Sequence, residues 1–247
     1  YQQASEILTD LIATDLNRKD WKTLRSLALY REAGVYARQA MALDQLPLLE
    51  DSKNKFSEGI DLLEPLVQRF VDDVEIARTL SAFYENRAEV NVLLVENAGD
   101  DNLRTAVTED MDALVRMRLT LFEGMQDQNE QKVLSRDLAQ AYLNRARFGT
   151  RLNEDAAHIS ADFAKARTIF GSLEPNPDFQ PDIYRDLALT ELEEAELWFG
   201  LGDPDKACAR AQAAQAHMKS LLEASSNEQR NQRDSAYTDE QVRVYCE

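Results

Sequence analysis

Apolar residues along the chain recur three and four positions apart, which is the spacing of one face of an α-helix. The first such stretch runs from Gln2 to Asn17 and places Ile7, Leu8, Leu11 and Ile12 on one side. Gly and Pro supply only 8 and 6 of the 247 residues, which leaves little turn chemistry for β-hairpins. The pattern therefore predicts an all-α protein.

Breaks in the apolar pattern divide the chain into helices that return on one another. They predict one helical-repeat domain over 1–247, built from these parts: a capping helix at 1–19, repeat units at 20–70, 71–128, 129–177 and 178–224, and a polar tail or cap at 225–247. Within the first unit, Pro65 should kink its helix or end it early. Pro175 and Pro177 should stop another helix, and Asp203-Pro204 should start one.

A short motif marks the repetition. Arg-Asp-Leu-Ala occurs at 136–139 and again at 185–188, and looser copies occur at 78–81 and 25–28. The successive copies start 53, 58 and 49 residues apart. A period of about 50 residues within a helical pattern is typical of a stacked repeat array.

The alignment of the repeats extends beyond this motif. First helices match at Arg78, Leu80, Asn86, Arg87 and Ala88 against Arg136, Leu138, Asn144, Arg145 and Ala146, and in part at Arg185, Leu187 and Ala195. Second helices match at Phe56, Gly59, Leu63 and Leu66 against Phe163, Ala166, Phe170 and Leu173.

These residues, with Tyr142, the phrase Gly-Leu-Gly-Asp-Pro-Asp-Lys-Ala at 200–207 and Glu174-Pro175, resemble the tetratricopeptide repeat superfamily over about residues 20 to 224. The units are longer than the family's usual ~34 residues, and most Trp and Gly signature positions are missing. The resemblance implies a right-handed α-solenoid of about four antiparallel helix pairs with extra terminal helices. Irregular arrays of this kind also resemble helical regions attached to bacterial serine/threonine kinases and other signalling proteins.

In the resembled family, the first helix of each unit lines a concave groove. Carried over, this implies a peptide-binding set comprising Arg78, Asn86, Arg136, Gln140, Asn144 and Arg185, with Arg25 as a weaker member. Guanidinium groups bind carboxylates in a two-pronged manner, so an acidic or C-terminal peptide segment is the expected ligand. The alternative is that each arginine pairs with an acidic residue of its own protein, such as Asp137 or Asp186.

The net charge of −17 and the pI of about 4.6 disfavour nucleic acid and anionic membranes as partners. The apolar runs are too short for direct membrane insertion. Only two histidines are present, His158 and His217, and there is no Cys-x-x-Cys pair, so no metal site and no cofactor are expected. Adjacent carboxylates such as Glu193-Glu194 indicate a solvated helix face more than an acid/base pair.

Cys208 and Cys246 admit two interpretations. They are either unrelated free thiols or a disulfide that ties the C-terminal tail to the last helix pair. A disulfide would require an oxidising compartment, so the localisation stays open between cytoplasm and periplasm.

The sequence therefore predicts a non-catalytic scaffold that binds a protein or peptide in the groove of a helical-repeat array. A sensory or regulatory region of a larger bacterial signalling protein, such as a serine/threonine kinase, is the alternative. An all-helical enzyme is a remote third, because the inventory of catalytic motifs is empty.

Overall fold

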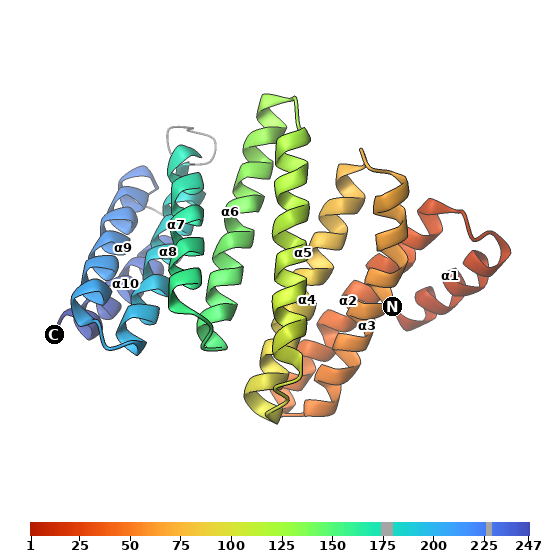
Figure 1. Ribbon diagram of the computed structural model, residues 1–247, viewed down its shortest axis with the longest axis horizontal. Helices are drawn as coiled ribbons and strands as arrows, with labels where there is room; N and C mark the ends of the chain where they lie inside the picture. The colour runs from red at the N-terminus through yellow and green to blue at the C-terminus, as the bar shows by residue number, and fades with distance from the viewer. Residues whose placement is uncertain (174–179, 226–228) are drawn as a thin grey trace. The chain divides into compact units, whose positions relative to one another are not determined.

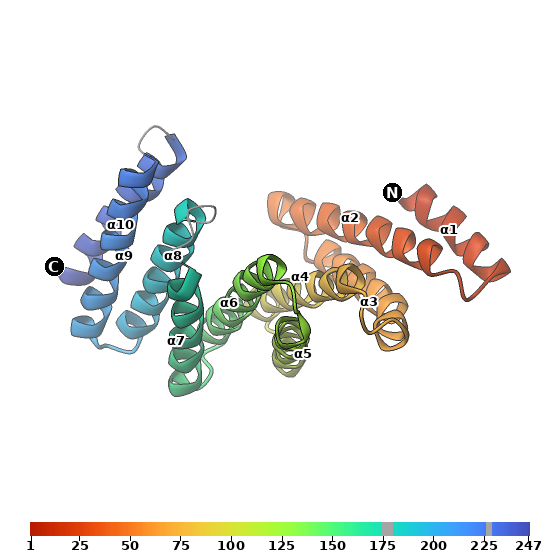
Figure 2. The same cartoon turned by 90° about the horizontal axis from the view of Figure 1, so that it is seen from above.

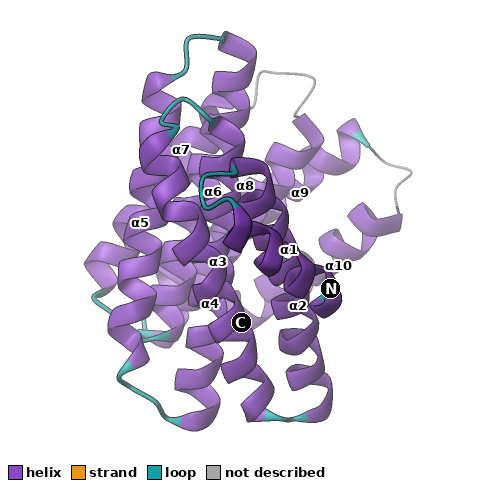
Figure 3. Cartoon of the chain, turned by 90° about the vertical axis from the view of Figure 1, so that its right-hand side faces the viewer, coloured by secondary structure: helices purple, strands orange, loops and turns teal. Residues whose placement is uncertain are grey.

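The computed structural model describes residues 1–173, 180–225 and 229–247. Every regular element in these ranges is a helix, as Figure 3 shows, and the prediction of an all-α fold is confirmed. The expected stop at Pro175 and Pro177 lies outside the described residues. None of the described helices is long and apolar enough to cross a bilayer.

The chain divides into two compact units, which comprise residues 1–121 and 122–247. Within each unit, consecutive helices pack against one another and run in opposite directions (Figures 1 and 2). The first five helices are α1 (Gln2–Thr14), α2 (Lys19–Leu43), α3 (Leu46–Arg69), α4 (Val74–Ala98) and α5 (Leu103–Gly124). The other five are α6 (Gln128–Arg151), α7 (Ala156–Leu173), α8 (Gln180–Gly200), α9 (Pro204–Ala224) and α10 (Gln229–Cys246).

Short polar residues start several of these helices by accepting hydrogen bonds from otherwise unpaired backbone N–H groups. The Asp203 side chain accepts from the Lys206 N–H, and Pro204 occupies the first helical position, as the sequence predicts. Asp73 and Asp127 cap α4 and α6 in the same way. Gly99 ends α4 at φ 69°, a left-handed conformation that glycine adopts without steric penalty.

Two segments bear on the sequence-based expectation. Pro65, expected to kink its helix or end it early, lies inside α3, which continues to Arg69, so the proline does not end the helix at its own position. The segment predicted to be a polar tail or cap contains α10, a helix that begins at Gln229. Its low apolar content hides it from a search for periodic apolar residues, because its docking depends on polar side chains and a disulfide.

An aromatic cluster forms the centre of the N-terminal unit. The rings of Tyr30, Phe56 and Phe83, from α2, α3 and α4, meet edge to face with centroids 5.3–5.9 Å apart. Gly59 lets α3 approach this cluster, because a Cβ atom there would lie 2.0 Å from Cε1 of Phe83. The repeat alignment places Gly59 opposite Ala166, and the structure buries both residues.

In the C-terminal unit, small and aromatic residues share the core. Phe148, Phe163 and Phe170 are almost fully buried between α6 and its neighbours. Along α9, Ala207, Ala211 and Ala214 are completely buried, and their short side chains let α8 and α9 pack closely. Contacts between α6 and α8, and between α8 and α10, show that alternate helices are also neighbours in this unit.

Candidate functional site

Each of three helix pairs is joined by an ion pair between its two helices. In the first, Arg87 of α4 grips Asp110 of α5 with two hydrogen bonds, Nε to Oδ2 at 2.9 Å and Nη2 to Oδ1 at 2.6 Å. Asp110 is almost fully buried, and the guanidinium carbon lies 5.9 Å from the centre of the Tyr84 ring. Burial raises the pKa of Asp110, although the hydrogen bonds and charge of Arg87 oppose that rise.

The same group of three residues recurs in the next pair of helices. Arg145 of α6 donates from Nε and Nη2 to the two carboxylate oxygens of Asp162 in α7, at 2.6 and 2.8 Å. Its guanidinium carbon lies 5.6 Å from the centre of the Tyr142 ring. Tyr142 and Arg145 follow Tyr84 and Arg87 by 58 residues, the same step that separates the motif copies.

In the last pair the charges are exchanged. Glu194 of α8 stands at the position that aligns with Arg145, one motif step of 49 residues later. Its Oε2 accepts from Nη1 of Arg167 at 2.5 Å and lies 3.3 Å from Nε of Arg210 in α9. Glu191 joins both arginines as well, at 3.3 and 3.1 Å.

These ion pairs are structural features that the choice of groove residues missed. Arg87 and Arg145 belong to the repeat alignment, but the resemblance did not place them in the groove. One feature of the sequence could have indicated these ion pairs. An arginine recurs at the same position of the first helix in two repeats, and an aspartate follows in the second helix of each. A buried two-pronged pair favours a single register of packing between two helices.

The two predicted groove arginines of the C-terminal unit pair with side chains of their own protein. Arg136 donates from Nε to Asp186 at 2.7 Å and from Nη1 to Asp182 at 3.1 Å, both on α8. Arg185 donates to Asn231 at 2.5 Å and to Asp234 at 3.2 Å, both on α10. The sequence also allows a second interpretation, in which each arginine pairs with an acidic residue of its own protein. Arg136 and Arg185 follow this second interpretation.

The remaining predicted groove residues lie in both units. In the N-terminal unit, Arg78 is partly buried on α4, and Asn86 donates to the Tyr30 hydroxyl at 3.1 Å and to the Ala82 carbonyl at 2.7 Å. In the same unit, Nη2 of Arg25 lies 3.4 Å from Glu58.

In the C-terminal unit, Gln140 and Asn144 lie on the same side of α6 as Arg136. The carbonyl oxygen of the Asn144 side chain accepts from Nε2 of Gln140 at 3.1 Å. It also accepts from Nη2 of Arg147 at 3.1 Å, and Asn144 itself is 1% exposed. Gln140 and Asn144 thus position Arg147, which the sequence-based set of groove residues did not include.

We call the surface where these side chains meet the next alternate helix the α6–α8 face. It consists of Arg136, Gln140, Asn144 and Arg147 of α6 with Asp182, Asp186, Leu189 and Glu193 of α8. Helical spacing places each group of four along one side of its helix. The Arg136 ion pairs occupy one end of the face, and Arg147 and Glu193 lie towards the other.

Arg147 differs from Arg136 because it makes no ion pair within the described residues. Its single hydrogen bond goes to Asn144, and its Nε is buried without an acceptor. A buried N–H that donates to nothing is unfavourable by about 1–3 kcal/mol, and native proteins retain few such groups. The Arg147 guanidinium therefore has unused donors for an acceptor supplied from outside.

Glu193 is the matching side chain on α8. It is partly buried and makes neither a hydrogen bond nor an ion pair in the part of the chain that the structure describes. Burial raises the pKa of its carboxyl group above the ordinary glutamate value, and the charges of Arg147 and Arg151 offset only part of that rise. The α6–α8 face thus carries one cation and one carboxylate that are both incompletely satisfied.

A cavity of about 170 Å³ lies at the C-terminal end of α8, next to the start of α7. Its lining comprises Thr150, Asn153, Glu154, Ala156, Ile159, Glu196, Leu197, Gly200 and Leu201. Glu196 also raises the pKa of Glu193, so the cavity adjoins the α6–α8 face. This volume would hold one side chain of a partner and is too small for a cofactor.

The described residues can also be compared with the groups that bind metals or act as nucleophiles. Among the described residues, no group of three or more histidine, cysteine or acidic side chains could hold a metal ion. His158 is exposed and lies 3.9 Å from the Asp162 carboxylate, which Arg145 already occupies. Cys208 and Cys246 form a disulfide, so neither is available as a nucleophile.

No family model matches the chain, and no curated protein matches it either. Among solved structures, it is similar to the de novo designed helical repeat protein DHR64, with a TM-score of 0.47 and 13% identity. That alignment covers 91% of this chain and 94% of the designed one. It is also similar to the DHF58 filament, with a TM-score of 0.45, 14% identity, and coverage of 92% and 96%.

Proposed function

We propose that the protein is a non-catalytic scaffold of the tetratricopeptide-like type, and that its α6–α8 face binds a peptide segment carrying a carboxylate. The observation that carries this proposal is Arg147, whose Nε is buried without an acceptor while Gln140 and Asn144 hold the side chain in place. A carboxylate is the ligand that matches the planar donor set of a guanidinium group.

Glu193 supplies the complementary half of the recognition. Its carboxylate accepts hydrogen bonds from a peptide N–H or from a basic side chain that lies next to the bound carboxylate. Leu189, one turn before Glu193 on α8, is 37% exposed and offers apolar contact beside the two charged groups. A suitable peptide therefore has a carboxylate, from an acidic side chain or from the C-terminus, and a hydrogen-bond donor next to it. Such a peptide would contact Arg147, Leu189 and Glu193.

The test uses fluorescein-labelled octapeptides with one or several acidic residues, each made with a free or an amidated C-terminus. Binding to the full chain is followed by fluorescence anisotropy. For every peptide that binds, Arg147→Ala should weaken the affinity about tenfold or more, because it removes a charge-assisted hydrogen bond.

The matched control is Lys219→Ala, which removes an exposed cation from α9 of the same unit and should leave affinity unchanged. Circular dichroism establishes that both variants are folded. If peptides bind Arg147→Ala as tightly as the parent chain, or if no acidic peptide binds at all, the proposal is wrong.

A further inference from the structure

The last helix is attached to its unit in an unusual way, because none of its apolar side chains is fully buried, and only a few, such as Val242 and Tyr245, are partly buried. Its two buried residues are Asn231 and Thr238, whereas Tyr237 and Val244 are 60% and 49% exposed. Other helices of the unit bury several apolar residues each, for example Ala207, Ala211 and Met218 of α9. The hydrophobic effect therefore contributes little to the docking of α10.

Polar contacts hold one part of α10. Arg185 of α8 donates to Asn231 and to Asp234, and Gln215 of α9 donates to Asp239 at 2.7 Å. Asn231 also donates to the Ser225 carbonyl at 3.0 Å. The exposed contact between Gln215 and Asp239 contributes only about 0–1 kcal/mol, and the hydrogen bonds of the buried Asn231 contribute about 1 kcal/mol each, so this set alone attaches α10 weakly.

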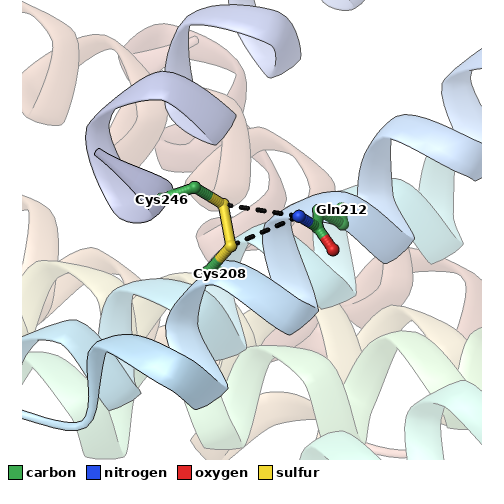
Figure 4. The surroundings of a disulfide bond; sticks show 3 residues. All are labelled: Cys208, Gln212 and Cys246. Atoms are coloured by element: carbon green, nitrogen blue, oxygen red, sulfur yellow. Dashed lines mark hydrogen bonds between the residues drawn. A yellow bond between two sulfur atoms is a disulfide. The ribbon is translucent and has the colours of Figure 1, made fainter.

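The other end of α10 is fastened covalently. The disulfide between Cys208 and Cys246 joins the C-terminal end of α10 to the first turns of α9, as Figure 4 shows. Close by, the ring of Tyr245 lies 5.2 Å from that of Phe199, which is half exposed. Cys246 is exposed, so a small reductant can reach the bond.

We propose that the surface of α8 and α9 around Arg185 is a docking surface for a polar helix that presents aspartate side chains, that α10 is its resident occupant, and that opening the Cys208–Cys246 bond releases α10. The chemistry of the occupant is visible in the contacts: an asparagine and an aspartate for Arg185, and a second aspartate for Gln215. The proposal stands on α10 alone and is independent of the role of Arg147.

The reductant is a dithiol. One of its thiolates attacks Sγ of Cys246, a mixed disulfide forms, and Cys208 leaves as the thiolate and takes up a proton. The second thiol of the reductant then displaces Cys246. Two cysteine thiols are formed, and the dithiol is oxidised to its own disulfide, so atoms and electrons balance.

Amide hydrogen exchange on the full chain tests the release. In the oxidised protein, the amides of 229–246 should be protected. Dithiothreitol, or Cys246→Ser, should speed their exchange by about tenfold or more and leave the protection of α6 and α7 unchanged. Cys208→Ser is the matched control, since it breaks the same bond at its other end and should give the same result.

Either of two outcomes overturns the proposed release. If α10 stays protected after reduction, the polar contacts suffice and the disulfide does not control the helix. If protection is lost throughout α6 to α9, the disulfide stabilises the whole unit and α10 is not separately detachable.

Disulfide trapping tests the docking surface. A synthetic peptide with the sequence of residues 229–247, its cysteine joined to glutathione, is mixed with the Cys246→Ser chain. If the peptide docks as α10 does, the Cys208 thiolate attacks the peptide's sulfur and glutathione leaves. The adduct should form about tenfold faster than with a peptide that carries alanine in place of Asn231 and Asp234, because docking raises the local concentration of the reacting sulfur. Equal rates for the two peptides would contradict the proposed surface.

Discussion

At the scale of single residues, the Glu193 side chain is expected to lower the stability of the folded protein. Its carboxylate is partly buried and unpaired among the described residues, and burial raises its pKa. Proteins lower their own stability at binding sites in this way, because a group that waits for a ligand is poorly satisfied without it. The residue thus gives the proposed site a property that can be measured without any ligand.

Glu193→Gln should therefore stabilise the free protein at pH 7, by about 2 °C in melting temperature, which corresponds to roughly 1 kcal/mol for a chain of this size. A raised folded-state pKa means that the contribution of Glu193 to stability is present below its unfolded pKa and is lost as pH rises through the folded pKa. The gain from Gln should accordingly shrink as the pH approaches 4.

The measurement is a pair of thermal melts at pH 7 and pH 4 for the parent chain and the variant. Glu223→Gln, at an exposed position on α9 of the same unit, is the control. A variant that is less stable than the parent at pH 7 would mean that Glu193 makes a favourable interaction in the folded chain.

Which polar side chains lie near one another could be predicted from the sequence only in part. The alignment of Asn86 with Asn144 and of Arg87 with Arg145 is visible in the sequence, because those residues recur at a fixed step. The partners are not visible in the same way. Arg136 pairs with Asp186 across about 50 residues, and 45 acidic residues compete for 28 basic ones, so spacing alone does not select the pair.

At the scale of helices, an ion pair joins the two helices of each of three hairpins, α4–α5, α6–α7 and α8–α9. The first two hairpins place arginine on the first helix and aspartate on the second, whereas the third reverses the signs with Glu194 and Arg210. Each of these three hairpins therefore pairs opposite charges at the aligned positions, and the helix that carries the cation differs between them.

Exchange of the charges in the second hairpin tests this interpretation. Arg145→Glu or Asp162→Arg alone should lower the free energy of unfolding by about 3–5 kcal/mol, since each leaves like charges buried together. The double exchange copies the arrangement of the third hairpin and should recover a large part of the loss. Urea denaturation measures all three variants.

The control for this cycle is Asp101→Ala, which removes an exposed partner of Arg104 and should change the free energy of unfolding by less than about 1 kcal/mol. If the double exchange is as unstable as the sum of the two single changes, there is no favourable coupling between the exchanged side chains, and the orientation of the pair matters more than its charges.

Helices with apolar periodicity could be predicted from the sequence, and those without it could not. The stripes of α6 and α7 are regular, and the structure buries the aligned Phe163, Ala166 and Phe170. Pro65 does not end α3 at its own position, because packing against neighbouring helices stabilises the helix around a residue that weakens an isolated helix. Helix α10 could not be predicted from apolar periodicity, because its contacts involve Arg185, Asp234 and a disulfide instead of an apolar face.

At the scale of the whole molecule, the net charge of −17 acts on every conformation of the chain. Many of its ion pairs lie at the surface, where each contributes little, whereas repulsion among the excess carboxylates acts over the whole folded surface. Salt weakens both effects, because the screening length falls from about 10 Å at 0.1 M to about 3 Å at 1 M. The balance between the two decides the direction of the salt dependence.

We expect repulsion to outweigh the surface ion pairs, so that raising NaCl from about 0.05 M to about 0.5 M increases the melting temperature by about 2–4 °C, or roughly 1 kcal/mol. The same rise with KCl would show that screening, and not a bound ion, is responsible. Asp72→Lys at the exposed turn before α4 removes two units of net negative charge, and it should raise the melting temperature at low salt and lose that effect at high salt. A melting temperature that falls with salt would mean that the ion pairs of Arg87, Arg145 and Glu194 outweigh the repulsion, and that this acidic protein depends on them for its stability.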